Sequence, residues 1–143
     1  MPRERVYSSA LEQLKAVGLR PTRQRLALAR LLFEGGDRHV SAESLHEEAA
    51  QRHIPVSLAT VYNTLHQFTA AGLLREVVVE PGRSYFDTNR HEHHHFFNEA
   101  TGRLMDIPGD QVALSRLPEV PEGYSVARVE VVIRLKEDDK QPR

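Results

Sequence analysis

The fold of this chain is decided by residues 55–74, which read PVSLATVYNTLHQFTAAGLL. Ser57 suits the cap position before a helix, and Gly72 suits the position at which the helix ends. Between them, apolar side chains recur every three or four residues, which is the spacing of one buried helical stripe: Leu58, Val61, Leu65 and Phe68. The stretch therefore predicts an amphipathic helix whose polar face begins near its first turn.

Other helices precede this one, and a hairpin follows it. Periodic apolar positions between caps and glycines predict helices over residues 7–17, 22–33 and 41–50. Downstream, Pro81-Gly82 between two β-rich runs predicts a hairpin over Val77–Phe86. Helices followed by a hairpin form the element order of a winged helix-turn-helix, whose last helix reads the major groove of DNA.

The periodicity changes in the second half of the chain. We expect strands at His93–Phe97, Arg103–Ile107 and Val126–Leu135, and a short helix over Gln111–Leu117. The predicted fold class is α+β. A winged helix-turn-helix DNA-binding domain occupies residues 1–84, and a small α/β domain occupies residues 85–143.

Composition excludes several classes of protein. Among 143 residues there are eight histidines and no cysteine, which excludes disulfides, thiolate zinc sites, iron–sulfur clusters and thiol catalysis. No apolar run approaches the ~20 residues of a membrane helix, and no secretion signal follows Met1. We therefore expect a cytoplasmic protein with no membrane partner.

Basic residues are concentrated at the start of the chain. The formal net charge is −1, yet residues 1–30 hold seven Lys or Arg against two Asp or Glu. A local basic surface suits contact with phosphates. Charge alone, however, fits a solvated arginine-rich helix better.

Polar side chains near the start of the helix at 57–74 are the candidates for reading bases: Ser57, Thr60, Tyr62 and Asn63. Asn63 can pair with adenine, and Tyr62 can contact a thymine methyl group or a phosphate. The candidates for phosphate contact are Arg20, Arg23 and Arg83. The alternative is an ordinary helical domain whose polar residues only face solvent.

Four of the eight histidines lie within residues 91–95, which read HEHHH. On an extended chain, His93 and His95 project from one face and His94 from the other. Two imidazoles with a carboxylate from Asp87 form a credible site for Fe(II), Mn(II) or Zn(II). The alternative is a solvent-exposed loop that is rich in histidine.

The same five residues also satisfy H-E-x-x-H, the pattern of zinc metalloproteases. That chemistry needs a helix, because only there do the two histidines share a face. The flanking sequence has no helical stripe, and no histidine follows position 95 as a third ligand. We therefore expect no enzymatic activity.

Three motifs resemble those of the ferric uptake regulator family: PVSLATVYNTL with AGLL within 55–74, GLRPTRQR at 18–25, and HVSAE at 39–43. The similarity extends from about residue 8 to about residue 135. It implies a homodimeric, metal-responsive transcription regulator that binds double-stranded DNA at palindromic, AT-rich operators. The second domain would then serve dimerisation and sensing.

The resemblance also implies the ligands of the regulatory metal: His39, Asp87, His93, His95 and Asp106. Three imidazoles and two carboxylates suit five- or six-coordinate Fe(II) or Mn(II), although Zn can occupy such a site in a purified sample. Because His39 belongs to the helical half, the metal would bridge the two halves. Glu92 and His94 occupy positions that contribute to a second metal site in some members.

The chain departs from the family at Asn98 and Thr101, where most members carry a C-x-x-C pair that binds structural zinc. A structural zinc held by four cysteines is therefore not expected. The missing cysteines, with HHHFF at 93–97, resemble the iron response regulator branch, whose members sense iron through haem. Haem iron accepts axial imidazole, and His94 is the candidate here.

The resulting prediction is a repressor-type regulator of iron or haem homeostasis whose DNA affinity is controlled by haem or by direct Fe(II) or Mn(II) binding. Two alternatives share this fold: a metal-activated repressor of the ferric uptake type and a peroxide sensor. Outside the fold, the alternatives are a metal chaperone and a small zinc metalloenzyme.

Overall fold

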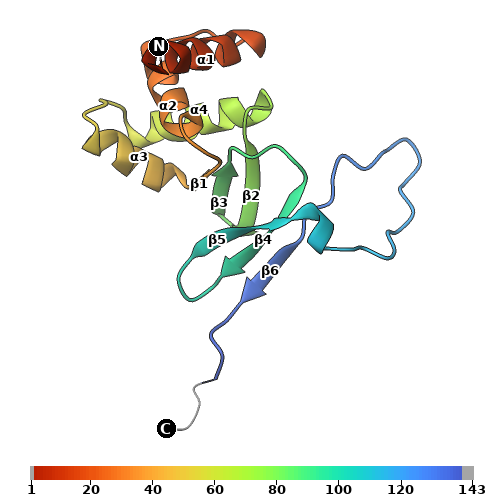
Figure 1. Ribbon diagram of the computed structural model, residues 1–143. Coiled ribbons are helices and arrows are strands. Elements are labelled where there is room, and N and C mark those ends of the chain that lie inside the picture. The colour runs from red at the N-terminus through yellow and green to blue at the C-terminus, as the bar shows by residue number, and fades with distance from the viewer. Residues whose placement is uncertain (1, 140–143) are drawn as a thin grey trace. The chain divides into compact units, whose positions relative to one another are not determined.

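A computed structural model describes residues 2–139 of the chain and divides it into two compact units, residues 1–90 and 91–143 (Figure 1). The first unit holds the helices and a small sheet, and the second holds another sheet. This composition confirms the predicted α+β class. The predicted domain boundary after residue 84 falls inside a strand, whereas the two units divide after residue 90.

Over its described residues, 2–90, the first unit contains four helices: α1 Pro2–Ala16, α2 Arg23–Phe33, α3 Ala42–Gln51 and α4 Leu58–Ala70. Side-chain oxygens cap three of them, because the first backbone N–H groups of a helix have no partner within it. Thr22 accepts from the N–H of Arg25, and Ser57 accepts from the N–H of Thr60. Ser41 and Ser44 form a reciprocal capping box on α3.

Gly72 ends α4 and turns the chain back toward the core. Its φ of 87° lies in the left-handed region that glycine adopts without strain. The N–H of Leu73 then donates to the carbonyl of Phe68 at 2.9 Å. Leu73 and Leu74 are both 4% exposed, so this turn adds two side chains to the core.

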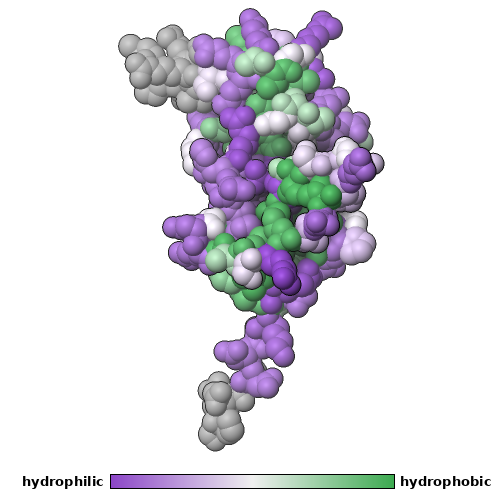
Figure 2. Space-filling model, turned by 90° about the vertical axis from the view of Figure 1, so that its right-hand side faces the viewer, coloured by the Kyte–Doolittle hydropathy of each residue, from purple (hydrophilic) through white to green (hydrophobic). Residues whose placement is uncertain are grey.

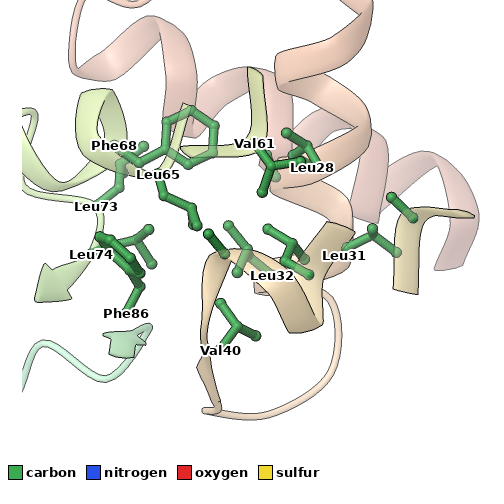
Figure 3. Close-up of a cluster of buried hydrophobic side chains, with 14 of the residues drawn as sticks. Leu28, Leu31, Leu32, Val40, Val61, Leu65, Phe68, Leu73, Leu74 and Phe86 are labelled. Carbon is green, nitrogen blue, oxygen red and sulfur yellow. The ribbon is translucent and has the colours of Figure 1, made fainter. Parts of the chain in front are cut away.

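The sheet of the first unit has the strand order β1-β3-β2, formed by β1 His39–Val40, β2 Arg75–Glu80 and β3 Arg83–Asp87. β2 and β3 form the predicted hairpin, and β1 is a short strand that the sequence did not predict. Figure 3 shows Phe86 of β3 and Val40 of β1 in one apolar cluster with side chains of α2 and α4. The hairpin is therefore fixed to the helices by shared core packing.

The second unit is a three-stranded sheet of order β5-β4-β6, with β4 His93–Asn98, β5 Arg103–Pro108 and β6 Val132–Leu135. β4 is antiparallel to β5 and parallel to β6. The strands predicted over 93–97 and 103–107 are confirmed. Each extends one residue further, because the cross-strand pairing continues from His93↔Pro108 to Asn98↔Arg103.

Two predictions in this half are wrong. The helix expected over Gln111–Leu117 is a single 3-10 turn, η1 Gly109–Gln111, and within the described chain residues 112–131 form neither helix nor strand. Pro118 and Pro121 remove two backbone donors there and disfavour helix before them. The strand expected over 126–135 forms only at its last four residues, which pair with β4.

On the face that Figure 2 shows, most side chains are hydrophilic, and apolar side chains gather in patches among them. The large apolar side chains that are exposed include several from the irregular segment 112–131: Leu114, Leu117, Val120, Tyr124 and Val126. Within the described residues, no helix has the length and apolar character needed to cross a membrane.

Candidate metal and DNA-binding sites

The first candidate ligand pair lies in the sheet of the first unit, and we call it the β1–β3 cluster: His39 and Asp87. The two residues stand opposite each other in the pairing of β1 with β3. The Nε2 atom of His39 lies 3.5 Å from Oδ2 of Asp87, whose side chain is fully buried. Oδ1 of Asp87 accepts a hydrogen bond from the N–H of Asn89 at 2.8 Å. A buried carboxylate beside an imidazole is a competent pair of oxygen and nitrogen ligands for a divalent metal.

Arg38 fixes the strand that carries His39. Its guanidinium donates to both carboxylate oxygens of Glu48 at 3.0 and 2.7 Å, and to the carbonyl of Leu31 at 3.1 Å. Its backbone N–H donates to Oγ1 of Thr88, and its carbonyl accepts from the N–H of Thr88. The hydrogen bonds with Glu48 raise the pKa of Arg38 and lower the pKa of Glu48. Arg38, the residue before His39, therefore ties β1 to α2, to α3 and to the residue that follows β3.

The second candidate set lies in the sheet of the second unit, and we call it the β4–β5 cluster: His93, His95 and Asp106. The Nε2 atoms of both histidines lie 3.4 Å from Oδ1 of Asp106. The two imidazole rings, 4.6 Å apart between centroids, confirm that His93 and His95 share one face of β4. Both histidines are buried, whereas the carboxylate of Asp106 is 38% exposed.

His94 projects from the opposite face of β4, as the alternation of a strand requires. Its Nδ1 accepts a hydrogen bond from the backbone N–H of Val131 at 3.0 Å, and its side chain is 8% exposed. An Nδ1 that accepts must be unprotonated, so the neutral ring carries its proton on Nε2. Glu92, the other residue of the expected second site, is exposed and precedes β4.

The turn between β4 and β5 involves Asn98 and Thr101, the two positions at which the family resemblance implies a C-x-x-C pair. Here Oδ1 of Asn98 accepts from the N–H groups of Ala100 and Thr101, at 2.9 and 3.1 Å. Oγ1 of Thr101 accepts from the N–H of Arg103 at 3.3 Å. Both substituted residues therefore close the turn by hydrogen bonds, in place of thiolate ligands.

The candidate DNA-reading residues lie around the start of α4. Arg20, Thr60 and Asn63 line one hollow of about 380 Å³, between the start of α2 and α4. Tyr62 and Arg83 line another of about 260 Å³, between α4 and the β2–β3 turn. Ser57 serves mainly as the cap of α4, and its hydroxyl donates to Oγ1 of Thr60 at 2.9 Å. Arg23 is exposed at the first position of α2.

Arg25 is a residue that sequence reasoning missed. Its guanidinium donates to Oε1 of Gln67 at 3.0 and 3.3 Å, and to the carbonyl of Arg20 at 2.9 Å. These bonds fix the loop that carries Arg20 against α4. Gln67 is 42 positions away in the sequence, and no local pattern signals such a pairing.

Known proteins are similar to this chain over most of its length. The model of the ferric uptake regulator family matches residues 16–134. The ferric uptake regulation protein of Shigella flexneri is 36% identical over 100 residues, which are 69% of this chain and 68% of that protein. The peroxide-responsive repressor PerR of Staphylococcus aureus is 28% identical over 94% of this chain and 92% of its own length.

Solved structures agree in fold. The ferric uptake regulator from Pseudomonas aeruginosa with manganese has a TM-score of 0.71 at 23% identity, covering 91% of this chain and 98% of its own. A zinc-bound manganese uptake regulator has a TM-score of 0.63 at 24% identity, covering 90% of this chain and 98% of its own. The family model, the relatives and the shared fold lead to one conclusion: the chain belongs to the ferric uptake regulator family.

Proposed function

We propose that this protein is a DNA-binding repressor whose affinity for its operator is set by a divalent metal ion held by His39, Asp87, His93, His95 and Asp106. One observation carries the proposal: at two separate places in the chain imidazole stands beside carboxylate, and neither group by itself is a complete metal site. The β1–β3 cluster offers two ligands and the β4–β5 cluster three.

The donor set fits Fe(II) or Mn(II). Imidazole nitrogen and carboxylate oxygen are ligands that both ions accept, and five of them approach the five- or six-fold coordination these ions favour. No thiolate is available, because the chain has no cysteine. The relatives support the same range of metals, since solved members hold manganese, iron and zinc. When bound, the metal would supply a positive charge that draws both carboxylates and all three imidazoles onto one centre.

A single ion shared by both clusters would couple the two units. His39 and Asp87 belong to the unit with α4, whereas the other three ligands belong to the unit with β4. Metal occupancy would then restrict the orientation of α4 relative to the rest of a homodimer, and so favour a fixed operator spacing. We propose a palindromic, AT-rich operator, a cytoplasmic location and no catalytic activity.

Duplex binding by the metal-free and Mn²⁺-loaded protein tests this function. A regulator should bind the duplex with an affinity that falls steeply as the salt concentration rises, because phosphate contacts release counterions. This affinity should also differ between the metal-free and the Mn²⁺-loaded protein. Absence of duplex binding in both states, and in the haem-loaded state, would contradict the proposal. A peroxide sensor, as the relative from Staphylococcus aureus is named, would in addition lose DNA binding when Fe(II)-loaded protein meets peroxide.

Haem is the second candidate signal, and His94 is the residue that favours it. The side chain is buried on the face of β4 opposite the β4–β5 cluster, and its Nδ1 is held by Val131. Ligation of haem iron through Nε2 would require the ring proton to move from Nε2 to Nδ1, with loss of the hydrogen bond from Val131. Haem titration of wild type and His94→Ala tests this directly. A Soret shift that the variant loses supports ligation there, and no shift in the wild type rejects it.

A further inference from the structure

We infer that His66 is a positioning residue for DNA recognition, which holds the side chain of Tyr62 in place for the major groove. The inference rests on the proposed function, because it requires α4 to be the recognition helix. The sequence alone assigned no role to His66. The structure places it between a candidate DNA-reading residue and the core.

The rings of three residues form a continuous series. Tyr62 and His66 lie one helical turn apart, so their side chains share a face of α4, and their rings stack with centroids 5.4 Å apart at 29°. His66 also meets Phe86 edge to face, with centroids 5.5 Å apart at 87°. Both geometries are among those that aromatic rings favour.

The inner end of this series is rigid. Phe86 is 1% exposed and lies on β3, the middle strand of its sheet, paired with Val40 on one side and Glu76 on the other. A close-packed core residue of this kind has little freedom to move. His66 therefore rests on a fixed surface and transmits that order outward to Tyr62.

The outer end is where order is useful. Tyr62 is 37% exposed and lines the hollow that also includes Arg83 of the β2–β3 turn. An exposed aromatic side chain that is free to rotate loses that freedom when it binds, which weakens binding. Stacking on His66 restricts the ring of Tyr62 beforehand, so less freedom is lost when DNA arrives.

The experiment measures DNA affinity of the full Mn²⁺-loaded protein. The probe is a duplex that the wild type selects from a random-sequence pool. We expect His66→Ala to weaken binding about fivefold, the effect of one side chain that must be ordered on binding. His66→Phe keeps a ring in place and should restore affinity to near the wild-type value. His46→Ala, the same change on neighbouring α3, is the matched control and should bind like the wild type.

A double variant separates positioning from direct contact with DNA. If His66 acts through Tyr62, then His66→Ala has no further effect in a Tyr62→Ala background. The inference is overturned if His66→Ala binds like the wild type, if His66→Phe does not restore binding, or if the loss persists without Tyr62. These results leave the proposed function intact, whereas failure of the wild type to select any duplex would contradict that function as well. Unchanged Mn²⁺ affinity and thermal unfolding in each variant show that the fold is preserved.

Discussion

The two ligand clusters are built in different ways. The β1–β3 cluster depends on contacts between distant parts of the sequence, because Arg38 ties β1 to Leu31, Glu48 and Thr88. The β4–β5 cluster comes from one hairpin whose strands are joined by a short turn. Its carboxylate is 38% exposed, whereas that of Asp87 is fully buried. The first cluster is thus fixed by tertiary packing, and the second is assembled locally with one ligand left accessible to solvent.

The largest expected effect is a loss of Mn²⁺ affinity when one ligand of either cluster is removed. If both clusters share one ion, His39→Ala and Asp106→Ala should each weaken Mn²⁺ binding by more than the roughly 10–100-fold that loss of an outer-shell partner costs. Calorimetric titration should give one ion per chain, and the double variant should be little worse than either single one. Asp110→Ala, an exposed acid on η1, is the control. Two independent sites, each surviving loss of the other, would contradict the shared ion.

A smaller effect is expected from the residues that position His39. Glu48→Gln removes the charge that holds the guanidinium of Arg38, so β1 becomes less constrained. We expect Mn²⁺ affinity to fall about tenfold, as when a partner outside the coordination sphere is lost. Glu47→Gln, an exposed neighbour on α3, should leave affinity unchanged. If Glu48→Gln bound Mn²⁺ as tightly as Glu47→Gln, Arg38 would have no part in placing His39.

The turn that supports the second cluster gives the next effect. Asn98→Ala removes the acceptor for two backbone N–H groups, and we expect a loss of about 1 kcal/mol in stability. Hydrogen exchange should locate the change in the amides of β4 and β5, with those of α2 and α4 unaffected. Glu119→Gln, on the exposed irregular segment, serves as control. Faster exchange throughout the chain would show that the turn supports more than its own hairpin.

The smallest effect is a dependence of stability on pH. Because the pKa of Glu48 is lowered from its ordinary value of 4.5, its pairing with Arg38 stabilises the folded state fully above that pH. The contribution is lost as the pH falls through the lowered pKa. The pair is partly exposed, so the difference in unfolding free energy between wild type and Glu48→Gln should be at most about 1 kcal/mol near pH 7. Denaturation of metal-free protein should show this difference shrinking toward pH 3, and a constant difference would contradict the assignment.

The two clusters also differ in how far their structure could be predicted from the sequence. The helices of the first unit, the β2–β3 hairpin and the shared face of His93 and His95 follow from local periodicity, and the structure confirms them. The pairing of β1 with β3 does not, because two residues are too short a strand to give a periodic signal. His39 was therefore identified by family resemblance, while its approach to Asp87 is visible only in the structure.

The helix and most of the strand predicted around segment 112–131 are wrong for a different reason. Its valines and leucines have the composition of strand and helix, but a strand needs a neighbour with a free edge. Only Val132–Leu135 find one, alongside β4. Composition thus indicates which residues are able to form a strand, and pairing decides which of them do so. The contact of Arg25 with Gln67 escaped for a similar reason, since it joins residues that no short pattern connects.

Because Asn98 and Thr101 close their turn with oxygen acceptors, this sheet is not sensitive to the reactions that break a thiolate metal site. Thiolates that hold a structural ion can be oxidised, and a chelator can remove the ion from them. Amide and hydroxyl oxygens undergo neither process, and the chain contains no cysteine at all. If His93, His95 and Asp106 hold the metal as proposed, its removal or exposure to oxidants would therefore leave intact the hydrogen bonds that close this hairpin. The closure of the turn would then not depend on the ion that the protein is proposed to sense.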